Sequence, residues 1–184
     1  MTHQLLIVTG QDRPGIVGAV SQLLAKKKIN LEDLRMSILE GEFAMMVVVR
    51  IPNNKIQAEL DRSLAQLKKK WELLIFQCPL GALEALKASQ KKLAQGSTWI
   101  IRVLGKDKTG IVSAVSQSLA KYHCNITDLQ CRILGTGAKS IYTMVLECSI
   151  PKKTNLRALK QALTRLAKRI SVELQIQHAD LIHL

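Results

Sequence analysis

The feature that most constrains the fold is an internal repeat with a spacing of 95 residues. The segment 10–17, Gly-Gln-Asp-Arg-Pro-Gly-Ile-Val, returns at 105–112 as Gly-Lys-Asp-Lys-Thr-Gly-Ile-Val. At the same spacing the agreement continues through Ala114, Val115, Ser116, Gln117, Leu119, Ala120, Lys121, Asn125, Asp128 and Leu129. Agreement over such a length indicates a duplication. We therefore expect two small domains of about 80 to 90 residues each.

The apolar patterns of the first half predict the order strand, helix, strand, strand, helix, strand. Strands are expected at 3–9, 31–39, 43–51 and 71–78, with a hairpin turn at 40–42. The first helix is expected to begin near Pro14, because proline is favoured at the first helical position. The second is predicted by apolar residues at helical spacing, namely Ile56, Leu60, Leu64 and Leu67.

The second half repeats this order. Strands are expected at 98–104, 126–134, 140–150 and around 172–176, helices at 111–121 and 155–169, and a hairpin at 135–139. A four-residue insertion in that hairpin changes the spacing of the repeats from 95 to 99. We place the domains at 1–78 and 98–184, with a partly helical linker at 79–97.

This order predicts the α+β class, with each repeat a ferredoxin-like βαββαβ domain. Because the connections are short, each domain should be a four-stranded antiparallel sheet with two helices on one face. Leu5 and Ile7 alternate with Leu6 and Val8 in the first strand. The sheet face opposite the helices is therefore also apolar, and we expect the linker or another copy of the chain to cover it.

The loop after the first strand has the groups that a free amino acid needs. The following helix presents unpaired N–H groups to a carboxylate. Asp12 can accept hydrogen bonds from an ammonium group, and Asn30 offers both a donor and an acceptor. The structural alternative is that Asp12 caps the helix, that Gly10 gives a sharp turn and Gly15 a close approach, and that Asn30 bonds to local backbone.

The loop at 12–17, together with Asn-Leu-Glu-Asp at 30–33, resembles the ACT domain, a small-molecule regulatory module with the same βαββαβ order. The tandem pair resembles the glycine cleavage system transcriptional repressor group. In the ACT family, amino acids bind between two domains placed side by side, where the loop of one faces the Asn-bearing segment of its neighbour. The resemblance thus implies an eight-stranded sheet made from the two repeats.

Carried over to this chain, the resemblance implies two sets of ligand-binding residues. The first set is Gly10, Asp12, Arg13, Pro14, Gly15 and Ile16, with Asn30 and Leu31. The second set is Asp107, Lys108, Gly110 and Ile111, with Asn125 and Ile126. Lys108 replaces Arg13 and Thr109 replaces Pro14 in the second copy, so its ligand preference is open.

We expect no enzyme activity, metal or cofactor. The histidines at 3, 123, 178 and 183 are scattered, and no serine or cysteine nucleophile lies beside a base in a known motif. His178 and His183 lack a patterned third ligand for a metal. The four cysteines show no CxxC spacing, so we expect reduced and mostly buried thiols.

A basic nucleic-acid-binding module of ferredoxin-like fold is the alternative function. The net charge is +13, and residues 98–184 hold 13 basic and 5 acidic side chains against 11 and 8 in residues 1–78. RNA-recognition sheets stack bases on aromatic side chains, but only 3% of this chain is aromatic and the second repeat offers only Tyr142 in that strand. The basic helix at 155–169 is either a solvated face or a docking surface.

The function expected from the sequence is therefore amino-acid sensing without catalysis. Such a protein would modulate transcription of amino-acid metabolism, of the glycine cleavage type, through a protein partner such as a transcription regulator. Direct nucleic-acid binding ranks below this, and a homodimer remains open. With no apolar run of 18 residues and no signal-peptide pattern, we expect a cytoplasmic protein that does not bind membranes.

Overall fold

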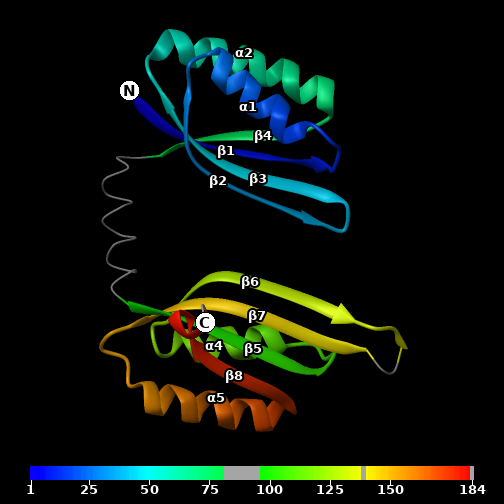
Figure 1. The fold of residues 1–184 in the computed structure, drawn as a ribbon, viewed down its shortest axis with the longest axis vertical. Helices are drawn as coiled ribbons and strands as arrows, with labels where there is room; N and C mark the ends of the chain where they lie inside the picture. Colours follow the sequence, from blue (N-terminus) through cyan, green and yellow to red (C-terminus); the bar gives the residue numbers. More distant parts are fainter. Residues whose placement is uncertain (81–95, 138–139, 183–184) are drawn as a thin grey trace. The chain divides into compact units, whose positions relative to one another are not determined.

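The computed structural model describes residues 1–80, 96–137 and 140–182. These residues divide into two compact units, which we call unit 1 (1–80) and unit 2 (96–137 and 140–182). Figure 1 shows the same two layers in each unit, a four-stranded sheet with two helices on one face. The duplication in the sequence is therefore a duplication of the fold.

Unit 1 has the predicted order of elements. They are β1 (Thr2–Gln11), α1 (Ile16–Lys26), β2 (Asn30–Leu39), β3 (Glu42–Ile51), α2 (Asn54–Trp71) and β4 (Leu74–Leu80). All four strands pair antiparallel, in the order β2-β3-β1-β4. The predicted ferredoxin-like arrangement is confirmed.

Unit 2 repeats the arrangement. Its elements are β5 (Gly96–Lys106), α4 (Ile111–Ala120), β6 (Asn125–Leu134), β7 (Ile141–Pro151), α5 (Leu156–Ile170) and β8 (Val172–His178), followed by the 3-10 helix η2 (Ala179–Ile182). The strand order is β6-β7-β5-β8, which matches unit 1 strand for strand. The sequence had given no indication of η2.

Each unit buries its own core between the sheet and the helices. The core of unit 1 includes Leu6, Val8, Ile16, Val20, Phe43, Met45, Val47, Leu60 and Leu64. The core of unit 2 includes Trp99, Ile101, Val103, Ile111, Val115, Met144, Leu146, Leu159 and Leu163. Burying a leucine-sized side chain contributes about 1.5 to 3 kcal/mol, so these faces hold the helices on the sheets.

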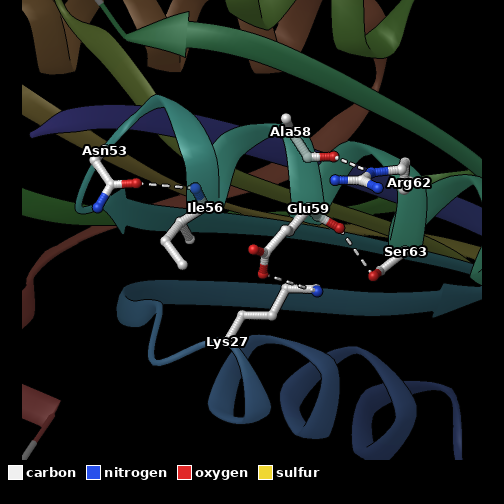
Figure 2. A network of polar contacts seen from close by, with 7 residues as sticks. All are labelled: Lys27, Asn53, Ile56, Ala58, Glu59, Arg62 and Ser63. Carbon is white, nitrogen blue, oxygen red and sulfur yellow. Dashed lines mark hydrogen bonds and ion pairs between the residues drawn. The ribbon is translucent and has the colours of Figure 1, made fainter.

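Asparagine side chains fix where the second helix of each unit begins. In unit 1 the Asn53 side chain accepts a 3.0 Å hydrogen bond from the backbone N–H of Ile56, as Figure 2 shows. In unit 2 the Asn155 side chain accepts a 3.0 Å hydrogen bond from the N–H of Ala158. Such a cap stabilises a helix by about 1 kcal/mol.

The sheet face opposite the helices differs between the units. In unit 1 the exposed fractions of Met46, Leu74 and Phe76 are 49%, 53% and 54%, so this face is largely apolar. In unit 2 the strand that corresponds to β4 places Glu173, Gln175 and Gln177 there instead. The expected apolar outer face is thus confirmed for unit 1 and only partly for unit 2.

Several predicted boundaries were wrong. Trp71 belongs to α2 and not to the last strand, because the chain leaves the helix only at Glu72, whose φ of 55° ends it. The first strand extends to Gln11 and therefore includes Gly10. Of the predicted linker, 79–80 belong to β4 and 96–97 to β5, while 81–95, and with them the predicted helix, lie outside the described residues. Residues 138–139 of the second hairpin also lie outside them.

The strand pairs described here lie within one unit or the other. Since the positions of the units relative to one another are not determined, the eight-stranded sheet stays a prediction. No helix within the described ranges is long and apolar enough to cross a membrane.

Candidate ligand-binding loops

The loop between β1 and α1 is a tight turn that leads into the helix. The N–H of Ile16 donates to the carbonyl of Arg13 at 3.5 Å, and Gly15 has φ 99° and ψ −6°. Proline at the second position and a left-handed glycine at the third define a type II turn. The helix was predicted to begin near Pro14, but Pro14 is not its first residue. Pro14 presets the turn, and α1 begins two residues later, at Ile16.

The two glycines of this loop have exchanged their predicted roles. Gly10 lies inside β1 opposite Phe43, and a Cβ there would lie 3.0 Å from Cδ2 of Leu73. Gly10 thus permits close packing, not a sharp turn. Gly15 supplies the left-handed conformation, and its own Cβ would lie 3.1 Å from Trp71. Gly15 needs glycine for its positive φ, whereas a Cβ at Gly10 would require the Leu73 side chain to shift.

The start of α1 is open to an anion. Its N-cap is Gly15, and no side chain caps the helix. The N–H groups of Val17 and Gly18 have no acceptor in the first turn of a helix. The alternative in which Asp12 is the cap is therefore wrong. Asp12 is exposed, its backbone N–H donates to the carbonyl of Gly41 at 2.8 Å, and its carboxylate has no partner within the described ranges.

Arg13 is held at the edge of this loop. Its Nη2 donates to Oε2 of Glu72 at 2.5 Å, and the two side chains are 40% and 73% exposed. Both groups meet solvent, so the pair contributes little to stability. Its effect is positional, because it ties the loop to the end of α2. No local pattern in the sequence could reveal a pair that spans 59 residues.

The corresponding loop of unit 2 has the same backbone conformation as the loop of unit 1 but different charged side chains. Gly110 has φ 91° and ψ 0°, and it is the N-cap of α4, again without a side-chain cap. Ser171 occupies the position of Glu72, so Lys108 lacks the acidic partner that Arg13 has in unit 1. Lys108 and Asp107 are both exposed. Ile111, like Ile16, is a buried core residue and can offer a ligand only its backbone.

The loop and the asparagine lie at opposite ends of each sheet. Gly10 is opposite Phe43, whereas Asn30 is opposite Arg50, seven residues further along β3. At about 3.3 Å per residue the two are roughly 23 Å apart. In unit 2, Gly105 and Asn125 pair with Tyr142 and Ser149, which gives the same separation. A single unit therefore does not bring the two halves of the predicted site together.

Beside each asparagine lies a bulge that the sequence did not reveal. The register shifts between Leu31 and Asp33 in β2 and at the equivalent place, between Ile126 and Asp128, in β6. Glu32, the extra residue, contacts Nε2 of His3 at 3.4 Å and Nε of Arg50 at 3.2 Å. The bulge turns Leu31 toward the same face as Leu34. The sequence signal for this bulge was the spacing of Leu31 and Leu34, because residues three apart in a regular strand would point to opposite faces.

Other reactive side chains lie away from the loops. Among the described residues no group of three or more His, Cys, Asp or Glu is arranged to hold a metal. His178 packs edge-on against Trp99 and lies 3.4 Å from Asp180. The cysteines are free thiols, of which Cys124 and Cys148 are buried, Cys131 is half-buried and Cys78 is exposed. The expectation of mostly buried thiols thus holds for two of the four.

Burial raises the pKa of three groups in the unit 2 core, namely Cys124, Cys148 and Tyr142. It raises the pKa of the Cys148 thiol to about 12, with smaller effects from Cys124 and Glu147. Burial likewise raises the pKa of Tyr142, whose hydroxyl lies 3.0 Å from Sγ of Cys131. Tyr142 is only 8% exposed and packs in the core, so it is unavailable for stacking a base.

The backbone of both units agrees with one known family. The model of the family described as "ACT domain" matches residues 3–77 and 97–177. The chain belongs to the ACT domain family. The two matches coincide with unit 1 and unit 2, so the protein carries two ACT domains in tandem.

The chain is similar to solved structures over nearly its whole length and to curated proteins over about one repeat. An unknown protein from Galdieria sulphuraria is 25% identical, with a TM-score of 0.76, and the match covers 97% of this chain and 98% of that one. A candidate glycine cleavage system transcriptional repressor has the same fold at 17% identity, with a TM-score of 0.71 over 96% of both chains. A UPF0237 protein from Methanosarcina mazei is 35% identical over 85 residues, which are 46% of this chain and 88% of that protein.

Proposed function

We propose that this ACT protein is a non-enzymatic amino-acid sensor that modulates transcription of amino-acid metabolism through a protein partner. The observation that carries the proposal is the loop 12–15. It joins an exposed carboxylate, which has no partner among the described residues, to a helix start without a side-chain cap. The ACT family provides the context, because its members bind amino acids at this loop.

The chemistry of the loop suits the two charged ends of an amino acid. The ligand carboxylate would accept hydrogen bonds from the N–H groups of Val17 and Gly18, where the helix dipole favours negative charge. Its ammonium group would donate to the Asp12 carboxylate. A charge-assisted hydrogen bond of this kind contributes about 1.5 to 3 kcal/mol. No catalytic step is needed for any of these contacts.

The asparagine must come from a second unit. Because Gly10 and Asn30 lie roughly 23 Å apart within unit 1, the proposed site pairs the Asp12 loop with Asn125, either of the same chain or of another copy. Joining the two units side by side would meet this requirement. The proposed site residues are therefore Gly10, Asp12, Arg13, Pro14, Gly15 and Ile16 facing Asn125 and Ile126, and Asp107, Lys108, Gly110 and Ile111 facing Asn30 and Leu31.

The glycine cleavage connection rests on a relative's description and on the fold that it shares with this chain. We extend it here only as a hypothesis for the regulated process. Within the same hypothesis the protein works in the cytoplasm, and a transcription regulator is its partner.

A thermal-stability screen of the twenty amino acids tests ligand binding. A true ligand at about 100 times its dissociation constant stabilises the native state by about 2.7 kcal/mol. For a chain of this size that raises the melting temperature by roughly 5 to 10 °C. The matched control is the D-enantiomer of the same amino acid or, if the ligand is the achiral glycine, N-acetylglycine, and it should give no shift. If none of the twenty shifts the melting temperature, amino-acid sensing is refuted.

Disulfide trapping tests the pairing of the units. After the exposed Cys78 is replaced by serine, Asp12→Cys is combined with Asn125→Cys or, as the control, with Asn30→Cys. We expect only the first pair to cross-link, and the mobility of the product separates a bond within one chain from a bond between two copies. Cross-linking of the control pair alone would contradict the proposed site.

A further inference from the structure

The helical layer of unit 2 carries basic side chains and no acidic ones. The segments 108–124 and 151–171, which contain α4, α5 and their flanks, hold nine basic residues: Lys108, Lys121, Lys152, Lys153, Arg157, Lys160, Arg165, Lys168 and Arg169. All nine are exposed. We call them the basic helix surface. None of them belongs to the ion pairs that the described residues form.

The duplicated layer in unit 1 provides an internal comparison. The equivalent segments, 13–29 and 52–72, also hold nine basic residues but include Glu59, Asp61 and Glu72. Each of these acids is engaged. Glu59 lies 3.9 Å from Nζ of Lys27, a contact between the two helices that Figure 2 shows. Asp61 accepts a hydrogen bond from the Gln57 amide, and Glu72 accepts one from Arg13.

All three acids are absent from the second copy. Ala158 replaces Glu59, and the contact between the helices becomes a hydrogen bond from the Tyr122 hydroxyl to the Ala158 carbonyl at 3.3 Å. Lys160 replaces Asp61, which reverses the charge, and Ser171 replaces Glu72. The packing between the helices is thus retained while the negative charge is removed.

Among the described residues, the basic helix surface also contains two shallow pockets. One shallow pocket on the outer side of α5 is lined by Leu156, Arg157, Lys160, Gln161, Thr164 and Arg165. A second, in the groove between α4 and α5, includes Lys121, Arg165 and Arg169. Arg165 lines both. From Arg157 to Lys168 the helix rises by about 17 Å, which is the length over which several phosphates of one strand would pass.

The composition of this surface favours a polyanion over a protein or a membrane. Protein interfaces need buried apolar anchors and are depleted in lysine at their centre. Leu156, at 36% exposed, is the apolar side chain with the greatest exposure on α5, and Leu159, Leu163 and Leu166 are buried in the core. A membrane-binding helix would have to insert such residues into the lipid. Binding to phosphate groups requires only the lysine and arginine side chains.

We propose that the basic helix surface of unit 2 binds duplex DNA through its phosphates, without reading the base sequence. Lysine and arginine side chains on α5 and in the α4–α5 groove would contact the backbone, and no aromatic or base-reading side chain is required. This site is separate from the amino-acid loops and does not depend on the function proposed for them.

Fluorescence anisotropy with a labelled 20-base-pair duplex of arbitrary sequence tests the proposal at 50 to 200 mM salt. The test variant is Arg157→Gln with Lys160→Gln and Arg165→Gln. The matched control is Lys68→Gln with Lys69→Gln and Lys70→Gln on α2, which removes the same charge from unit 1. All six residues are exposed, but Nζ of Lys160 also lies 5.1 Å from the centroid of the Trp99 ring, so binding is measured well below the melting temperature of each variant.

We expect the α5 variant to lose at least about 10-fold in affinity and its log-log salt slope to fall by up to about 2.7, since each phosphate contact contributes about 0.9. The α2 control should lose less than about 2-fold. Absence of DNA binding by the wild type at 50 mM salt would overturn the proposal, as would equal losses in both variants. Preferential binding of a polyglutamate chain of equal charge would identify an acidic protein as the occupant and overturn it too.

Discussion

The guanidinium of Arg13 donates to the carboxylate of Glu72 across 2.5 Å, and this pair has no equivalent in the second ACT domain. Since both side chains are largely exposed, a double-mutant cycle with Arg13→Ala and Glu72→Ala should give a coupling energy of about 0.2 to 1 kcal/mol. The coupling should shrink as salt is raised. Urea unfolding measures it. The matched cycle at Lys108 and Ser171 should give no coupling, and a comparable value there would contradict the assigned asymmetry.

Two glycines of unit 1 should respond in opposite ways to alanine. Gly15→Ala forces an L side chain into φ 99° and places its Cβ 3.1 Å from Trp71, so we expect a loss of more than about 1 kcal/mol. Gly18→Ala adds a methyl group where nothing lies within 4 Å and should raise stability by about 0.5 to 1 kcal/mol. Chemical denaturation of both variants checks these signs.

Gly110→Ala separates the two causes in the first of these variants. Gly110 has φ +91° but no atom within 4 Å of the added Cβ. It should therefore show the backbone strain without the contact to Trp71 and lose less stability than Gly15→Ala. An equal loss in both variants would mean that Trp71 moves aside without cost.

The buried thiol of Cys148 should make the protein less stable at high pH. Its pKa is raised from 9.0 to about 12 by burial, so the neutral form is favoured in the native state. That stabilisation is complete below pH 9.0, where the unfolded thiol is also neutral, and it is lost progressively as pH rises toward about 12. Unfolding free energies measured from pH 7 to 10 should fall above pH 9. Cys148→Ala should reduce the slope, and an unchanged slope would assign the decline to other groups.

Thiol labelling should follow burial. Cys78 is exposed, Cys131 is half-buried beside the Tyr142 hydroxyl, and Cys124 and Cys148 are buried with raised pKa values. Because the thiolate is the reactive form, a disulfide reagent at pH 8 should modify Cys78 rapidly and the two buried thiols only after urea is added. Rapid modification of Cys148 in the native protein would show that the unit 2 core opens.

The elements of this fold could be predicted because their apolar patterns are strong and occur twice. Leu34, Met36 and Ile38 alternate in β2 and pair opposite Val47, Met45 and Phe43 on the helix side of the sheet, although only Leu34 is partly buried there and Met36 and Ile38 are 44% and 52% exposed. The buried leucines of α2 have the predicted spacing. Periodicity reports which face is buried, and burial is what holds these elements together.

Element ends and the bulge were not predictable in the same way. Trp71 is as apolar as the strand that follows it, and only the left-handed conformation of Glu72 separates helix from strand. Glycine is the usual signal for that conformation, and here a glutamate adopts it. At Glu32 the extra residue is marked in the sequence only by the spacing of Leu31 and Leu34, which a strict period-two pattern does not identify as a bulge.

The candidate site was predictable in composition but not in geometry. The loop residues follow from the repeat and the family resemblance. The packing of Gly10 under Leu73 and the ion pair of Arg13 with Glu72 depend on the end of α2, whereas the turn at Arg13–Ile16 is local and the Pro14-Gly15 pair was its signal in the sequence. Contacts between segments some 60 residues apart leave no local trace in one sequence.

Calorimetric titration of the stabilising amino acid tests the central claim most directly, with the wild type, Asp12→Ala and Asp107→Ala compared in parallel. The type II turn that Pro14 presets lowers the cost of ordering the first loop, whereas Thr109 leaves the second loop freer. Losing a hydrogen bond to a charged ammonium costs about 1.5 to 3 kcal/mol, so Asp12→Ala should bind about 10- to 100-fold more weakly. Asp107→Ala should lose less. Binding by Asp12→Ala with wild-type affinity would contradict the account and leave the loop as a structural turn.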